Sequence, residues 1–318
     1  MKKLLLLLLP AYCTAQSPKP AMVLCEQSQH RIIIVEPGTG RITREWKADT
    51  AHAKWFTNPS DAKVVANGEY LITCASGGGV AIVRIKDKRT MFCAYAGGNT
   101  HSVELLPDGN IVSASSNGNY LTLFKVDTTH KINYQQQVPI PFGHNVVWDR
   151  QRNVLWSAGR HHLYRFRYNF DCAHPNLQLI DSVGIPGAEG HDLFPVFDRD
   201  SLWLTTTTVF SRVDAATMRI DTMSAKTVKH IKSVSSGPPG YPTIVSIPKE
   251  QWWTDEILDL QGNSIYREKG LKIYKARWIL YNDFSYDGRP WRPCKKKKAA
   301  VYAAALVFIY SGIYLLNR

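Results

Sequence analysis

The sequence of 318 residues lacks the signals of an α-helical protein and of several enzyme classes. Amphipathic stretches with a 3.6-residue period are almost missing, which excludes a helical bundle. No Gly-x-Ser-x-Gly elbow or paired-carboxylate signature occurs. The glycines at 77–79 precede neither a helix nor a Lys-Ser/Thr pair, so they indicate a hairpin turn and not a phosphate-binding loop.

Cysteine is scarce and widely spaced. Five cysteines follow the leucine-rich N-terminus, at positions 25, 74, 93, 172 and 294. No Cys-x-x-Cys pair occurs, so the sequence indicates neither a zinc-binding module nor a disulfide framework. One or two bridges stay open in an oxidising compartment, although small buried side chains are the simpler interpretation for most of these residues.

Acidic residues are outnumbered, but the imbalance lies mainly at the two ends. The chain has 39 lysines and arginines against 26 acids. Eight of the basic residues lie at positions 2, 3 and 292–318, where no acid occurs, which leaves 31 basic residues against the same 26 acids in the body. This mild excess is spread along the chain, so we expect no nucleic-acid partner.

Both ends carry hydrophobic segments. Residues 1–15, MKKLLLLLLPAYCTA, have the pattern of a secretory signal peptide, so we expect an exported protein in the periplasm, at the cell surface or outside the cell. Residues 292–318 contain a lysine run followed by an uncharged stretch, 299–317, that is nearly long enough to cross a bilayer. This stretch is either a membrane anchor or, from about residue 289, a non-native extension created by slippage in the lysine codons. A membrane partner is expected only if the anchor is real.

The body of the chain, 20–285, repeats itself. Similar strings begin at Ser60, His101, His144, His191 and His230, and the period is in the low forties. Each repeat contains short β-rich runs separated by turn signals, which is typical of a four-stranded propeller blade. Residues 22–47 supply three further strands, and 271–280 supply the missing first strand. The sequence therefore predicts an all-β, six-bladed β-propeller whose ring is closed by pairing of these N- and C-terminal strands. We expect this propeller to be a monomer.

Several motifs add a family resemblance. The strings HSVELLPDGNIVSAS, GHNVVWD, GHDLFPV, IKSV and WWTDEI resemble a family of secreted six-bladed propeller proteins from Bacteroidetes. The likeness covers most of residues 20–285. That family has no assigned activity, so the resemblance implies a fold and export but no mechanism.

The histidines at the start of the repeats are the main functional candidates. The first strand of every blade lines the propeller axis, so equivalent residues of successive blades face one another. We therefore expect an arc of ligand-binding side chains at one mouth of the central channel, formed by His101, His144, His191 and His230, with Trp148 nearby. Neutral imidazoles can bind one divalent metal, and the expected ligands are His101, His144, His191 and Asp192.

Three functions fit this pattern. The first is binding of a small molecule or glycan at the histidine-lined mouth, with or without the metal. The second, by analogy with propeller polysaccharide lyases, is a metal-assisted lyase or hydrolase acting on an acidic polysaccharide, with Lys232 and Tyr241 as catalytic candidates. The third is a scaffold for protein partners in which the histidines are structural.

Overall fold

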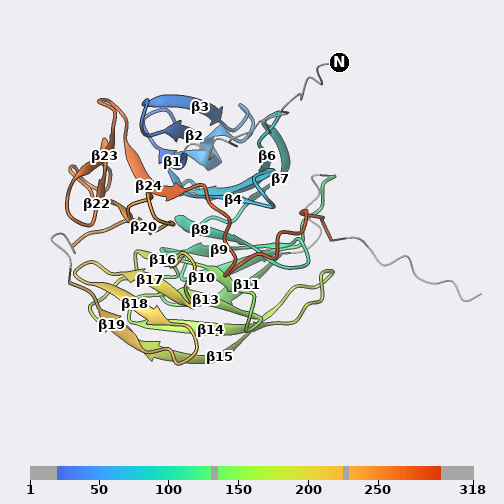
Figure 1. The fold of residues 1–318 in the computed structure, drawn as a ribbon. Coiled ribbons are helices and arrows are strands. Elements are labelled where there is room, and N and C mark those ends of the chain that lie inside the picture. Colours follow the sequence, from blue (N-terminus) through green and yellow to red (C-terminus); the bar gives the residue numbers. More distant parts are fainter. Residues whose placement is uncertain (1–19, 130–134, 225–228, 295–318) are drawn as a thin grey trace, which may run out of the picture.

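The computed structural model describes residues 20–129, 135–224 and 229–294 (Figure 1). The predicted signal peptide at 1–15 and the hydrophobic stretch at 299–317 lie outside the described residues. Within the described ranges, no helix combines the length and apolar character needed to cross a bilayer.

The described residues form 24 strands in six antiparallel four-stranded sheets, which surround a common axis as propeller blades (Figure 1). Blades 1 to 3 contain β4 (Pro59–Val65), β5 (Tyr70–Ala75), β6 (Gly79–Arg84) and β7 (Arg89–Tyr95); β8 (Thr100–Leu105), β9 (Ile111–Ser115), β10 (Tyr120–Phe124) and β11 (Gln135–Pro139); and β12 (Val147–Asp149), β13 (Val154–Ala158), β14 (His162–Tyr168) and β15 (Leu177–Gly184). Blades 4 and 5 contain β16 (Asp192–Pro195), β17 (Ser201–Thr205), β18 (Phe210–Asp214) and β19 (Ile220–Thr222); and β20 (Ser233–Ser235), β21 (Ile244–Ser246), β22 (Glu256–Asp259) and β23 (Ser264–Arg267).

The sixth blade joins the two ends of the described chain. It contains β24 (Ile273–Trp278), β1 (Met22–Glu26), β2 (Arg31–Glu36) and β3 (Arg41–Trp46), in that order from the axis. Strand β24 pairs antiparallel with β1, so that Met22 lies opposite Trp278. The predicted blade number and the predicted ring closure are both confirmed. A short 3₁₀ helix, η1 (Ala53–Phe56), connects this blade to blade 1.

The hydrophobic core lies between blades. Six apolar clusters are present, and each combines side chains from two neighbouring sheets. The middle strands of the blades are almost fully buried, whereas the outermost strands alternate between exposed and half-buried residues, as in β11 and β15. This gradient follows from the architecture, because only the inner strands are covered on both faces.

Polar side chains near the start of the first strands connect neighbouring blades. In four of the six blades such a side chain accepts a hydrogen bond from a backbone N–H of the following blade. The bonds join Val103 to Asp61, Val146 to Ser102, Val234 to Asp192 and Ala276 to Ser233, with donor–acceptor distances of 2.9 to 3.4 Å. Because these bonds repeat, they identify equivalent positions around the axis.

Candidate functional site

These inter-blade bonds identify the residues that form one mouth of the axis. In a blade that supplies the acceptor, the mouth residue is the one just before the acceptor; in a blade that supplies the donor, it is the one two positions before the donor. Where a blade supplies both, the two rules give the same residue. In this register the mouth residues of blades 1 to 6 are Ser60, His101, His144, His191, Lys232 and Tyr274. Three of the four predicted histidines therefore occupy one structural position in consecutive blades.

The fourth predicted histidine lies elsewhere. His230 is exposed, and its backbone N–H donates to the carbonyl of Thr207, 3.0 Å away. The equivalent position in blade 5 belongs to Lys232, whose ammonium lies 3.3 Å from Nε2 of His191. The start of this repeat, predicted at His230, is therefore wrong by two residues. The strand β20 is only three residues long and gives a weak sequence pattern.

The mouth side chains contact one another. The rings of His101 and His144 are stacked, with centroids 3.9 Å apart and planes 13° from parallel. The ring of His191 meets His144 edge-on at 5.3 Å. Across the axis, the Tyr274 hydroxyl lies 3.2 Å from Nδ1 of His101. The geometry thus brings together side chains from blades 2, 3, 4 and 6.

His144 is the least satisfied member of this group. Its side chain is 3% exposed, yet in the described part of the chain neither ring nitrogen has a hydrogen-bond partner. A neutral imidazole has one N–H donor and one nitrogen acceptor, and leaving them unpaired in the interior costs free energy. The site therefore has unused hydrogen-bonding capacity beside the axis.

The environment keeps the histidines neutral. Burial lowers the pKa of His101 and His144 well below the usual value, and neighbouring cationic and histidine groups lower it further. Burial, followed by the charges of Lys232 and Lys275, lowers the pKa of His191 to about 3.

Lys232 carries the positive charge of this mouth. Burial, followed by repulsion from Lys275, lowers the pKa of the Lys232 ammonium to about 8, while Glu189 opposes the shift. No carboxylate among the described residues lies within ion-pair distance of its Nζ. At neutral pH the group is therefore mainly a cation without a bonded counter-charge.

The axis below the mouth is filled by ion pairs. Three acids and three bases are buried there: Asp61, Glu104, Asp192, Lys63, Lys275 and Arg277. The carboxylate of Asp192 accepts hydrogen bonds at 2.6 Å from Arg277 and at 3.2 Å from Lys275. Burial raises the pKa of Asp61, but Lys63, Lys275 and Arg277 outweigh it and lower the value to about 2. The six charges balance, so this layer holds the blades together and leaves the charge of Lys232 uncompensated.

The geometry does not favour the predicted metal. In the ranges that the structure describes, no group of three or more His, Cys, Asp or Glu side chains is placed to hold an ion. Asp192 already accepts bonds from Arg277, Lys275 and the backbone of blade 5. Lys232 and Lys275 would also repel a cation at His191, so a divalent metal at this mouth stays a prediction without geometric support.

Two other predicted site residues lie at the opposite end of the blades. Trp148 is 1% exposed and packs edge-on against Tyr168 within the core between blades 2 and 3. Tyr241 follows β20 and packs against Trp278, with ring centroids 5.1 Å apart. Trp148 lies within the first strand of blade 3, and Tyr241 follows that of blade 5, whereas the histidines lie near or before the start of their strands. They therefore do not form one site with the histidines, which corrects the sequence-based assignment.

A segment after β24 covers this opposite end. We call residues 279–294 the strap; it is drawn in red in Figure 1. The Tyr286 hydroxyl bonds to the carboxylate of Glu104, and the carbonyl of Gly288 accepts from Asn67 at 2.5 Å. A Cβ at Gly109 would lie 1.9 Å from the carbonyl oxygen of Arg292, so only glycine permits this close approach.

The end of the strap is fixed to the propeller. The Trp291 ring is 8% exposed, lies 5.0 Å from the Tyr70 ring and donates to the carbonyl of Gly109. Cys294 forms a disulfide with Cys172 in the loop after β14. Residues 286–294 thus belong to the folded unit, beyond the limit at 285 that the repeats indicate.

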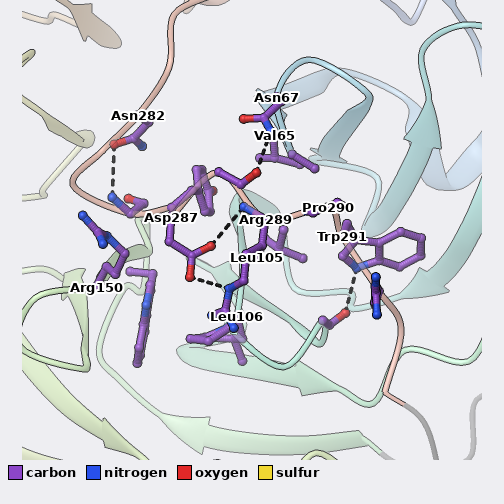
Figure 2. A pocket seen from close by; sticks show the side chains of 18 of the residues that line it. Val65, Asn67, Leu105, Leu106, Arg150, Asn282, Asp287, Arg289, Pro290 and Trp291 are labelled. Carbon is purple, nitrogen blue, oxygen red and sulfur yellow. Dashed lines mark hydrogen bonds and ion pairs between the residues drawn. The ribbon is translucent and has the colours of Figure 1, made fainter.

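The strap forms a wall of two cavities, of about 820 and 590 Å³. Both are bordered by Arg150, Leu280, Tyr281 and Asn282. Figure 2 shows the larger cavity, in which Arg150 and the strap residues Asp287 and Arg289 lie around a hollow above Leu105 and Leu106. No signal in the repeats indicates these cavities, because their wall comes from a segment outside the repeats.

Comparisons with known proteins agree with this architecture. No curated protein matches the sequence. A solved protein of unknown function from Bacteroides caccae is similar in structure, with a TM-score of 0.58 at 14% sequence identity, over 82% of this chain and 99% of that one. Hydrazine synthase from Kuenenia stuttgartiensis gives a TM-score of 0.48 at 11% identity, over 68% of this chain and 64% of that one. The likeness at 14% identity shows the fold alone. The model of a family of unknown function, DUF6528, matches residues 11–291, and the chain belongs to that family.

Proposed function

We propose that this exported propeller binds a small molecule or glycan with a carboxylate group at the histidine mouth. The unpaired ring nitrogens of His144, beside the uncompensated charge of Lys232, carry this proposal. A carboxylate accepts charge-assisted hydrogen bonds from an ammonium, and a neutral imidazole supplies an additional N–H donor. An acidic sugar combines such a carboxylate with hydroxyl groups that satisfy the remaining imidazole nitrogen.

The layer below the mouth supports binding at the surface and not passage through the disc. The six buried charges fill the axis, and Tyr286 of the strap lies behind them against Glu104. A ligand at the mouth would therefore meet Lys232 first and the ion-pair layer beneath it.

Calorimetric titration of the full chain with trigalacturonate tests the proposal, with maltotriose as the neutral comparison. We expect the acidic trisaccharide to bind and the neutral one not to bind at this mouth. Lys232→Met removes a charge-assisted bond worth about 1.5–3 kcal/mol, so affinity should fall at least tenfold. Lys229→Met changes an exposed lysine nearby and should leave affinity unchanged. Equal effects of the two substitutions would contradict the proposal.

The pH dependence gives a second test. The ligand should bind most tightly while Lys232 is protonated, and affinity should fall as the pH rises through about 8. In Lys232→Met this decrease should be absent. A decrease that is centred near pH 10 would instead indicate an ordinary exposed lysine.

A lyase activity at the same mouth is the second candidate. The pKa of Lys232 is lowered to about 8, so a minor fraction of the side chain is a neutral amine at neutral pH. In that form it could remove the proton α to the bound carboxylate, and the bond to the sugar oxygen at the β carbon would break. The Tyr274 hydroxyl, whose pKa is raised by burial, would stay protonated and could donate its proton to that leaving oxygen. The product would be an unsaturated sugar, seen as a new ultraviolet absorbance. Binding of trigalacturonate without this product would leave the binding function alone.

A further inference from the structure

A second hollow of this molecule lies on the opposite face and is independent of the histidine mouth. The larger strap cavity has a volume of about 820 Å³, within the roughly 300–1,000 Å³ of typical small-molecule sites. Its walls come from the ends of blades 1, 2 and 3 and from the strap, which the Cys172–Cys294 disulfide closes over them. The hollow is therefore a permanent part of the fold.

The charges around this cavity balance: Arg150, Arg289, Arg292, Asp108 and Asp287 line it, and Asp283 lies beside it as the partner of Arg150. The Arg150 guanidinium lies 2.9 Å from the carboxylate of Asp283. The Arg289 guanidinium lies 2.5 Å from the carboxylate of Asp287 (Figure 2). A charged ligand would find no uncompensated partner in either pair. An uncharged ligand, by contrast, can accept from the remaining N–H groups and donate to the remaining lone pairs of the carboxylates without separating the pairs.

Aromatic and polar side chains line the same hollow together. The rings of Phe170 and Tyr281 are each 50% exposed, and Phe170 lies edge-on over Trp148 with centroids 5.9 Å apart. The hydroxyl of Ser285 is buried at the cavity wall and has no hydrogen-bond partner among the described residues. Exposed rings provide flat apolar surfaces, while amides, guanidinium groups and a free hydroxyl provide donors and acceptors beside them.

We propose that the strap cavity binds a neutral saccharide of several rings. The C–H faces of sugar rings match the half-exposed aromatic rings, and sugar hydroxyls both donate and accept hydrogen bonds, as the polar wall requires. This site does not depend on the proposed carboxylate site, which lies at the other end of the axis and differs from it in charge.

Calorimetric titration of the full chain with cellohexaose, xylohexaose, laminarihexaose and maltohexaose tests the inference. We expect at least one of these neutral hexasaccharides to bind and to change the tryptophan fluorescence, because Trp148 and Trp291 border the cavity. Phe170→Ala and Tyr281→Ala should each weaken this binding at least tenfold. Tyr95→Ala serves as the matched control, since Tyr95 is 49% exposed and lies outside the cavity.

Each of the following results would overturn the inference. The first is that none of the four hexasaccharides binds. The second is that Tyr95→Ala weakens the binding as much as Phe170→Ala does, or that neither cavity substitution weakens it. Lys232→Met and His144→Phe separate this site from the histidine mouth, because they should leave hexasaccharide binding unchanged. If they abolish it, the saccharide binds at the mouth and the cavity assignment is wrong.

Discussion

Removing the Cys172–Cys294 disulfide should destabilise the propeller strongly. The bond joins two residues 122 positions apart, across blades 3 to 6. In the double variant Cys172→Ser/Cys294→Ser the folded strap keeps its other contacts, because Trp291 stays packed against Tyr70 and Tyr286 stays bonded to Glu104. The main change is therefore in the unfolded chain, which regains the freedom that the bridge had removed.

The size of the effect follows from the length of the closed loop. For a loop of this length the chain-entropy relation gives about 5 kcal/mol, which is an upper value because the unfolded chain retains some structure. A domain of this size loses about 2–4 °C of Tm for each kcal/mol. We therefore expect the Tm of the double variant to fall by about 10–20 °C.

Thermal and urea unfolding, followed by tryptophan fluorescence, measure this difference. Reduction of the native protein should lower its stability to that of the double variant and should have no effect on the variant itself. Cys93→Ser is the matched control, because Cys93 is a partly buried free cysteine. A peptide map without reduction should also contain the Cys172–Cys294 cross-link. A loss of less than about 1 kcal/mol in the double variant would refute the argument that the strap closes the fold.

Three further substitutions test the interior. Asp192→Asn should cost about 3–5 kcal/mol in urea unfolding, because it leaves Arg277 buried without its main counter-charge; a neutral outcome would show that water reaches this layer. Trp291→Ala should cost about 3–5 kcal/mol and increase proteolysis of the strap, while protection equal to the native protein would contradict the packing described here. His144→Phe should flatten the acid side of the stability profile. Burial lowers the pKa of His144, so the unfolded state binds more protons below about pH 6.5, and native stability falls on acidification by about 1.4 kcal/mol per pH unit for this residue. An unchanged slope in His144→Phe would show that this imidazole is already protonated in the folded protein.

The fold was predictable because the repeat is also the structural unit. Each first strand begins with a polar pair, such as His101-Ser102 or His191-Asp192, and continues into buried apolar residues. In four blades the second member of the pair bonds to the next blade, so a similar pair recurs at most junctions between blades. Closure by residues 271–280 could be predicted because one blade lacked a first strand.

The site was only partly predictable. His101, His144 and His191 follow from the repeat. In blade 5 the predicted repeat start is wrong by two residues, so His230 was assigned to the mouth position that Lys232 occupies. A periodic pattern also does not say near which end of its strand a side chain lies. It therefore does not say which face of the propeller the side chain approaches. Trp148 is only four residues from His144, but it lies farther along the first strand and therefore borders the strap cavity.

The strap and the ion-pair layer left weaker signals. Lys275 and Arg277 lie in a predicted strand, and two charges at alternate positions of an inner strand could have indicated buried ion pairs. Their partners Asp61 and Asp192 are far away in the sequence, and only the assembled ring brings them together. The strap contacts depend on single aromatic residues and one cysteine without any period.

The pairing of β24 with β1 also has a consequence for biosynthesis. The backbone N–H of Lys272, just before β24, donates to the side chain of Glu26, which lies 246 positions earlier. During translation the edge of β1 that pairs with β24 stays unpaired until nearly the whole propeller has left the ribosome. Such distant contacts slow folding, and an open edge invites pairing with other chains. The growing chain is thus most vulnerable to aggregation just before its last blade is completed, and chaperones that cover strand edges should act on it mainly in that interval.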